Sequence, residues 1–122
     1  MTTAAIANKY VELCKKGKNH EARALYADDA VSVEAFAPPG SDRVSRGLAA
    51  IGAKGEWWIA NHDIHSAIVA GPWPTDDKFI VGFKYDITFK PTGKRTTMEE
   101  MGLFTVQGGK ITREEFFYTT GA

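Results

Sequence analysis

Hydrophobic positions at the start of the chain recur at the spacing of a helix. Over residues 4–16 one stripe of apolar side chains consists of Ile6, Tyr10, Leu13 and Cys14. Positions separated by three or four residues share one face of an α-helix. The stripe therefore predicts an amphipathic helix whose apolar side faces a core.

Two further segments predict helices. Residues 19–26 predict a short helix that ends before a pair of aspartates. Residues 47–61 predict a longer helix, in which Gly52 and Gly55 each lower helix stability by roughly 1 kcal/mol relative to alanine. All three predicted helices lie in the N-terminal half of the chain.

The second half of the chain changes to the alternation typical of strands. From residue 78 to 90, apolar side chains occupy every second position, which predicts a long strand with one apolar face. Turn residues at 91–94 and 108–109 predict that the chain then folds back twice. Further strands are predicted at about residues 31–36, 63–70, 95–107 and 110–119.

This order of elements predicts the fold class. Helices confined to one side of a mostly antiparallel sheet make an α+β fold. Long strands must curl to stay paired, so we expect a curved sheet that forms a cone, packed with the three helices. A cone of this kind can hold a pocket for a small molecule. We expect residues 1–122 to form a single domain.

Composition and charge argue against several classes of function. The 122 residues contain 15 Lys and Arg against 15 Asp and Glu, so the positive charge expected of a protein that binds nucleic acid or an anionic membrane is absent. No apolar run approaches the roughly 20 residues of a membrane span, and no export signal opens the chain. The single cysteine, Cys14, can form no internal disulfide. These features predict a cytoplasmic protein without nucleic-acid or membrane partners.

Three short stretches resemble a known family. They are Tyr-Ala-Asp-Asp-Ala-Val-Ser-Val-Glu at 26–34, Arg-Gly-Leu-Ala-Ala-Ile at 46–51 and Gly-Lys-Ile at 109–111. Together they resemble the SnoaL-like branch of the nuclear transport factor 2-like superfamily, whose relatives include polyketide cyclases and ketosteroid isomerases. The likeness spans about residues 4–118 and implies a cystatin-like fold. That fold hosts isomerases, cyclases, dehydratases and plain binding modules, so it identifies the reaction poorly.

The resemblance implies two catalytic positions. In ketosteroid isomerases a tyrosine on the first helix donates a hydrogen bond to the developing enolate, and a carboxylate after the Ala-Asp-Asp-Ala stretch moves the proton. These positions fall on Tyr10 and Glu34. The position of a second oxyanion donor falls on Gly102, which has no side chain, and this argues against steroid isomerisation itself. The side chains expected to bind substrate or exclude water are Phe36, Lys54, Trp58, Phe83, Tyr85, Glu100, Phe104, Glu114, Phe116 and Tyr118.

The predicted inner face carries an unusual amount of acid. Glu34, Glu100 and Glu114 cannot all ionise in a space of low dielectric constant unless a cation or hydrogen-bond donors join them. That favours a ligand with an amine or hydroxyl groups. Adjacent residues of a strand face opposite sides, so either Glu99 or Glu100 faces inward, and the same choice is open for Glu114 and Glu115. A salt bridge across the sheet is the structural alternative for each of these carboxylates.

Two functions follow from these observations. The first is an enzyme that transfers protons on a small, largely apolar organic molecule without a cofactor, in an isomerisation, cyclisation, dehydration or hydrolysis. Glu34 would move the proton and Tyr10 would stabilise the oxyanion. The second is a non-catalytic ligand-binding or assembly module, in which a homodimer covers the half-apolar outer face of the sheet. We expect no metal site, because His62 and His65 would point to opposite faces of a strand.

Overall fold

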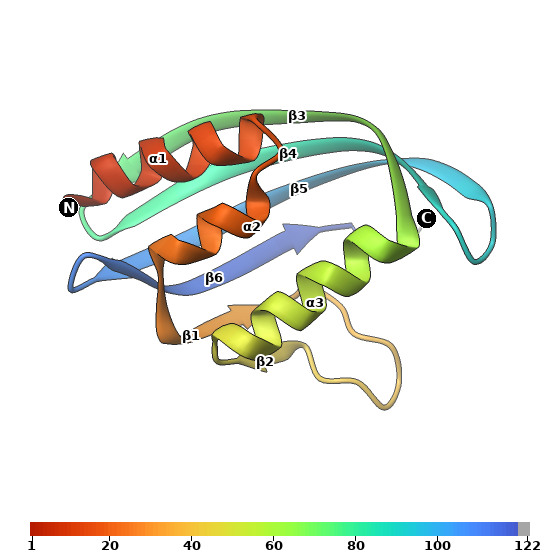
Figure 1. Ribbon diagram of the computed structural model, residues 1–122, viewed down its shortest axis with the longest axis horizontal. Coiled ribbons are helices and arrows are strands. Elements are labelled where there is room, and N and C mark those ends of the chain that lie inside the picture. Colours follow the sequence, from red (N-terminus) through yellow and green to blue (C-terminus); the bar gives the residue numbers. More distant parts are fainter. Residues whose placement is uncertain (120–122) are drawn as a thin grey trace.

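The computed structural model describes residues 1–119, which form a curved six-stranded sheet with helices packed against one face (Figure 1). The elements are α1 (Thr3–Lys15), α2 (Asn19–Ala22), a 3-10 turn η1 (Arg23–Leu25), β1 (Tyr26–Val33), β2 (Val44–Arg46), α3 (Leu48–Asn61), β3 (His62–Thr75), β4 (Lys78–Phe89), β5 (Lys94–Gln107) and β6 (Lys110–Tyr118). The predicted α+β class is confirmed. Among the described residues, no helix is both long and apolar enough to cross a bilayer.

The sheet is a meander that ends beside a parallel strand. Strands β3 to β6 pair antiparallel in chain order, β1 then lies parallel to β6, and β2 forms the edge beyond β1. The long strands curve as they cross the molecule (Figure 1). Helix α1 lies along β3 and β4, while α3 lies on the same face near β1 and β2. The sheet is not closed, so its inner face opens towards α3.

Helix α1 forms as its apolar stripe predicts. The side chain of Thr2 caps its first turn by accepting a hydrogen bond of 3.1 Å from the amide of Ala5. Lys15 lies in the last turn, where its charge favours the negative end of the helix dipole. Gly17 follows with a φ of 72°, a conformation that glycine adopts without strain.

Two element boundaries differ from the sequence-based prediction. The second helix ends early, because α2 passes into η1 and Tyr26 already begins β1. Strand β1 therefore runs through Asp28 and Asp29, whose side chains are exposed where its pairing with β6 shifts register. The strand β2, with only three residues, is an element that the sequence did not predict.

The core lies at the end of the sheet that α1 covers. Phe79, Val81 and Phe104 of β4 and β5 are completely buried. The rings of Phe79 and Phe104 stack with their centroids 4.7 Å apart, and the ring of Tyr10 on α1 lies 4.6 Å from that of Phe104. This packing closes one end of the inner face completely.

Candidate functional site

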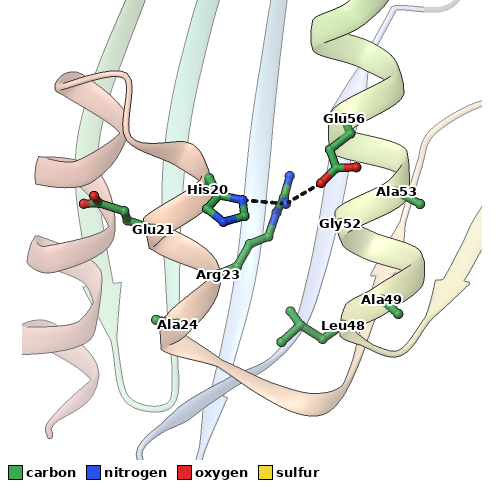
Figure 2. Close-up of a pocket in the computed structure, with 9 residues that line it drawn as sticks. All are labelled: His20, Glu21, Arg23, Ala24, Leu48, Ala49, Gly52, Ala53 and Glu56. Atoms are coloured by element: carbon green, nitrogen blue, oxygen red, sulfur yellow. Dashed lines mark hydrogen bonds and ion pairs between the residues drawn. The ribbon is translucent and has the colours of Figure 1, made fainter.

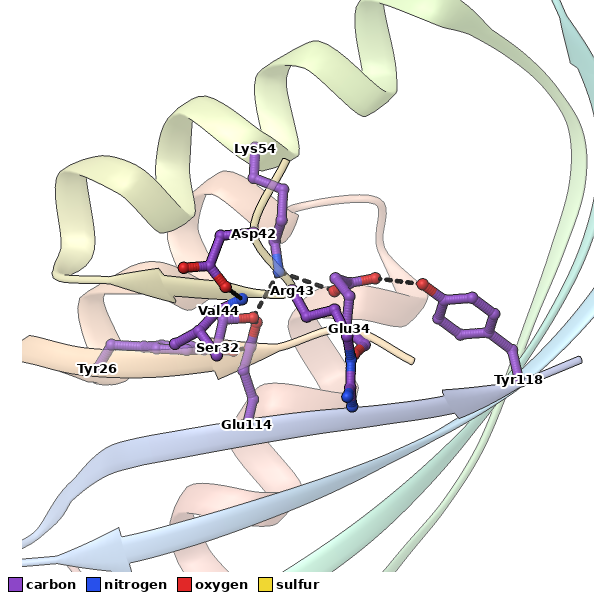
Figure 3. Close-up of polar contacts among 9 residues, drawn as sticks. All are labelled: Tyr26, Ser32, Glu34, Asp42, Arg43, Val44, Lys54, Glu114 and Tyr118. Carbon is purple, nitrogen blue, oxygen red and sulfur yellow. Dashed lines mark hydrogen bonds and ion pairs between the residues drawn. The ribbon is translucent and has the colours of Figure 1, made fainter. Parts of the chain in front are cut away.

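The open end of the inner face carries a carboxylate held between two donors (Figure 3). Glu34 follows the last residue of β1. One of its oxygens accepts a hydrogen bond of 3.0 Å from the hydroxyl of Tyr118, and the other accepts one of 2.8 Å from the ammonium of Lys54. The side chains of Glu34 and Lys54 remain 26% and 30% exposed, whereas Phe79 and Phe104 are completely buried. Solvent can therefore reach this carboxylate.

A second carboxylate lies deeper and joins the first through a chain of bonds. The Lys54 ammonium also donates to the hydroxyl of Ser32 at 2.5 Å, and Ser32 donates to Glu114 at 2.6 Å. The hydroxyl of Tyr26 donates to the other oxygen of Glu114. We call this group the polar chain; its members, from the open end to the core, are Tyr118, Glu34, Lys54, Ser32, Glu114 and Tyr26.

Local sequence explains why these side chains meet. Alternation along β1 turns Ser32 and Glu34 to the inner face, and the parallel register sets Ser32 beside Glu114 of β6. Lys54 reaches them from α3, which the buried side chain of Ile51 anchors one turn earlier. Three elements distant in sequence therefore supply one polar chain.

The two open choices of strand face are now settled. Glu100 pairs with Phe83 and faces inward, whereas Glu99 pairs with Lys84 on the outer face, where their charged atoms lie 3.6 Å apart. Glu114 is 5% exposed on the inner face.

Glu115 faces outward instead. Its carboxylate lies 3.3 Å from the guanidinium of Arg113. The inner face thus contains all three of the carboxylates that the resemblance implied, while the binding role of Glu100 and Glu114 stays a prediction.

Their shared surroundings shift the pKa values of two of these carboxyls. Burial, followed by the charges of Glu34 and Glu114, raises the pKa of Glu100 to about 7. Burial also raises the pKa of Glu114, while hydrogen bonds from Ser32 and Tyr26 oppose that rise. The expected excess of acid is thus offset by one ammonium, by three hydroxyl donors and by the raised pKa of Glu100.

Aromatic rings form the wall beside these groups. The half-buried ring of Trp58 on α3 stacks on His62, with centroids 4.4 Å apart, and lies 5.4 Å from the ring of Tyr85. The Lys54 ammonium lies 5.6 Å from the centroid of the Phe116 ring. Trp58, Tyr85, Phe116 and Lys54 therefore lie where sequence analysis expected substrate-binding side chains, and that role stays a prediction.

Other predicted site residues lie apart from Glu34. Tyr10 is 7% exposed within the core, and burial raises the pKa of its hydroxyl well above the ordinary value. Phe83 and Phe104 are also buried, and their ring centroids lie 6.1 Å from those of Tyr85 and Phe116 respectively. Phe36 was expected to exclude water, but β1 has ended before it and its side chain is 51% exposed.

Sequence analysis missed three members of the site. Ser32 is fully buried and Tyr26 is 6% exposed, yet both donate to Glu114. A serine on the inward positions of a valine-rich strand was a usable signal for a buried polar contact. His62 stacks on Trp58 because the chain enters β3 directly at the end of α3, which no local pattern indicated.

A surface groove of about 680 Å³ lies elsewhere, between α2 and α3 (Figure 2). Arg23 extends across it: its guanidinium lies 3.2 Å from a ring nitrogen of His20 on α2 and 3.9 Å from the carboxylate of Glu56 on α3. A Cβ at Gly55 would come within 2.6 Å of this guanidinium, and one at Gly52 within 3.4 Å. The two glycines that weaken α3 therefore make room for Arg23. Within residues 1–119, no group of three His, Cys, Asp or Glu side chains is placed to hold a metal ion.

Comparisons with known proteins agree with this architecture. The family model of the SnoaL-like domain matches residues 1–118. A protein from Mesorhizobium loti, provisionally named a SnoaL-like polyketide cyclase, is 47% identical, with a TM-score of 0.90 over 97% of this chain and 100% of that one. None of the curated proteins compared with the chain matches it.

More distant structures share the fold alone. A protein from Bacillus subtilis, provisionally named an isomerase, is 19% identical, with a TM-score of 0.78 over 98% of this chain and 90% of that one. An NTF2-like protein from Burkholderia thailandensis is 18% identical, with a TM-score of 0.84 over 98% of this chain and 92% of that one.

Proposed function

Because the chain belongs to the SnoaL-like domain family, we propose that it binds a small, largely apolar organic molecule on the inner face of its sheet and transfers a proton on it without a cofactor. Isomerisation and cyclisation are the reaction types that the named structural neighbours suggest. The observation that carries the proposal is the Glu34 carboxylate, half-buried and held by two donors beside aromatic rings.

Each group at the open end has a part in such a reaction. Glu34 takes a proton from a carbon next to a carbonyl; the C–H electron pair moves into the carbonyl group, which becomes an enolate. The Lys54 ammonium and the Tyr118 hydroxyl donate to Glu34 in the free protein. In the proposed reaction Glu34 loses its negative charge when it takes the proton, and these two donors then stabilise the developing oxyanion. Return of the proton to another carbon completes an isomerisation, and attack of the enolate on a second carbonyl completes a cyclisation.

In this proposal Tyr118 donates the hydrogen bond to the enolate, a role that the resemblance implied for Tyr10. Burial and the charge of Glu34 raise the pKa of the Tyr118 hydroxyl, so it keeps its proton and can donate it in a hydrogen bond. The rings of Trp58, Tyr85 and Phe116 limit the access of water, which strengthens these interactions.

Proton abstraction can be tested before the substrate is known. A panel of cyclic ketones and β-ketoesters is incubated with the protein in D2O, and deuterium incorporation next to the carbonyl is followed by NMR. We expect the protein to accelerate exchange in part of the panel, and Glu34→Gln to lower that rate by about 100-fold or more. Glu115→Gln, on the outer face of β6, is the matched control and should exchange at the wild-type rate.

Two results would overturn the proposal. One is a Glu34→Gln variant that exchanges as fast as the wild-type protein. The other is a panel in which no compound exchanges faster with protein than without it, which would favour a module that binds ligands and catalyses nothing.

The outer face of the sheet supports an additional proposal, that the chain forms a homodimer. Ile80, Met101 and Phe117 are 37%, 43% and 49% exposed there, and Met101 pairs directly with Phe117. An apolar patch of this kind is commonly covered by a partner. Sedimentation should then show a dimer at micromolar concentration that Met101→Lys dissociates, and a wild-type monomer would contradict it.

A further inference from the structure

Glu100 has aromatic neighbours on both adjacent strands. In the sheet it pairs with Phe83 on β4 and with Tyr118 on β6. One step further along the inner face of the same two strands lie Tyr85 and Phe116. Four aromatic residues thus flank Glu100 on the inner face of the sheet.

The charge of Glu100 is poorly balanced by the protein. Lys54 is the cation that acts on it, but the Lys54 ammonium is bound to Glu34 and Ser32 at 2.8 and 2.5 Å. The negative charges of Glu34 and Glu114 have the opposite effect, because they disfavour the ionised form of Glu100. A second cation at Glu100 would therefore gain both an ion pair and the faces of the surrounding rings.

We propose that Glu100 and the aromatic side chains around it bind an organic ammonium group, so that the substrate of this site carries an amine. The inference rests on the proposed function and adds a substrate class to it. The protein contains its own precedent, because the Lys54 ammonium already lies 5.6 Å from the centre of the Phe116 ring and 2.8 Å from Glu34.

Binding of the amine should depend on pH in a defined direction. The pKa of Glu100 is about 7, so its carboxylate is mostly ionised at about pH 8 and mostly protonated at about pH 6. The charged groups that act on it are Glu34 beyond β1, Lys54 on α3 and Glu114 on β6. Two further titratable groups interact with it, the hydroxyls of Tyr85 on β4 and Tyr118 on β6. An ammonium ligand should bind roughly tenfold more weakly at about pH 6 than at about pH 8, and Glu100→Gln should remove most of that difference.

The experiment compares two probes of one shape, benzylammonium and benzyl alcohol, by isothermal titration at about pH 8. We expect the wild-type protein to bind the ammonium at least about tenfold more tightly than the alcohol. Glu100→Gln should remove this preference and leave the alcohol affinity unchanged. Glu99→Gln is the matched control, since it removes the same charge from the opposite face of the same strand.

The outcomes separate this inference from the proposed function. It is overturned when the alcohol binds as tightly as the ammonium, when Glu100→Gln keeps the preference, when Glu99→Gln abolishes it, or when the ammonium does not bind. Proton exchange that depends on Glu34, without any preference for ammonium, would uphold the proposed function and overturn the amine. Ammonium binding without proton exchange would uphold the amine-binding inference and overturn the proposed function.

Discussion

The two ends of the inner face are built by the same strands but differ in burial and polarity. Under α1, Phe79 and Phe104 have no exposed surface and their rings stack. Beside α3, the same strands β4 and β5 contribute Tyr85 and Glu100, which are half-buried and lie next to ionised groups. One end is a dry core, and the other is a polar surface under partial cover.

This difference shows how a small domain can combine stability with chemistry. The dry end supplies most of the apolar burial, which is the main source of folding free energy. The open end can then retain three carboxylates and one ammonium, although each lowers stability when it is desolvated. Substitutions at the two ends should therefore differ in size and in their dependence on pH.

The largest expected effect is at the dry end. Phe104→Ala removes a fully buried ring that contacts Phe79 and Tyr10, and should lower the free energy of unfolding by about 3–5 kcal/mol. Phe116→Ala, at the half-buried end, should cost about 1–2 kcal/mol. Urea denaturation of both variants measures the contrast, and equal losses would mean that the two ends are packed alike.

The next effect is a pH dependence specific to the open end. The pKa of Glu100 is about 7 in the folded protein and roughly 4.3 when unfolded, so the folded state binds the proton more tightly between these values. Its contribution to stability is complete below about pH 4 and is lost as pH rises through about 7. Wild-type stability relative to Glu100→Gln should thus fall by roughly 3 kcal/mol from about pH 4 to pH 8. A difference that does not change with pH would refute the raised pKa.

A smaller effect should separate the inner ion pair from an outer one. Lys54→Met breaks the bonds to Glu34 and Ser32 and should lower the free energy of unfolding by about 1–2 kcal/mol. Lys84→Met breaks the exposed outer-face contact with Glu99 and should cost less than about 0.5 kcal/mol. Chemical denaturation measures both, and similar losses would place Lys54 in an ordinary surface pair.

The smallest effect distinguishes the two glycines of α3. Gly52→Ala places a methyl group 3.4 Å from the guanidinium of Arg23, an ordinary contact, and should stabilise the protein by about 0.5–1 kcal/mol. Gly55→Ala should show little or none of this gain, because its methyl group would lie 2.6 Å from the guanidinium and displace it. Thermal unfolding measures the stability of both variants. A larger stability gain for Gly55→Ala than for Gly52→Ala would mean that Arg23 does not pack closely against Gly55.

Much of the fold could be predicted because its elements carry strong periodic patterns. The stripe of α1 and the alternation of β4 are long enough to define type and face together. Strand β2 could not be predicted, since it has three residues and owes its conformation to pairing with β1. The residues of η1 carry a helical pattern that gives way to the sheet at Tyr26, whose partner on β6 is distant in sequence.

The site could be predicted less completely. The resemblance implied that Glu34, Glu100 and Glu114 face inward, and the structure has all three on the inner face. No local signal could show that Lys54 contacts Glu34, because that contact depends on how α3 docks on the sheet. The resemblance paired Tyr10 with Glu34, and Tyr10 lies in the core under α1. A position on α1 fixes which face of the helix is buried, without fixing which end of the sheet it meets.

The polar chain has a consequence for how this protein can change. Its six groups are bonded in series, so each side chain is the hydrogen-bond partner that gives its neighbour a reason to be buried. Removing one leaves the next unsatisfied, and the cost of two replacements together should differ from their sum. We therefore expect substitutions within this set to occur together. Relatives that lack Lys54 should also differ at Glu34 or Ser32, its two partners.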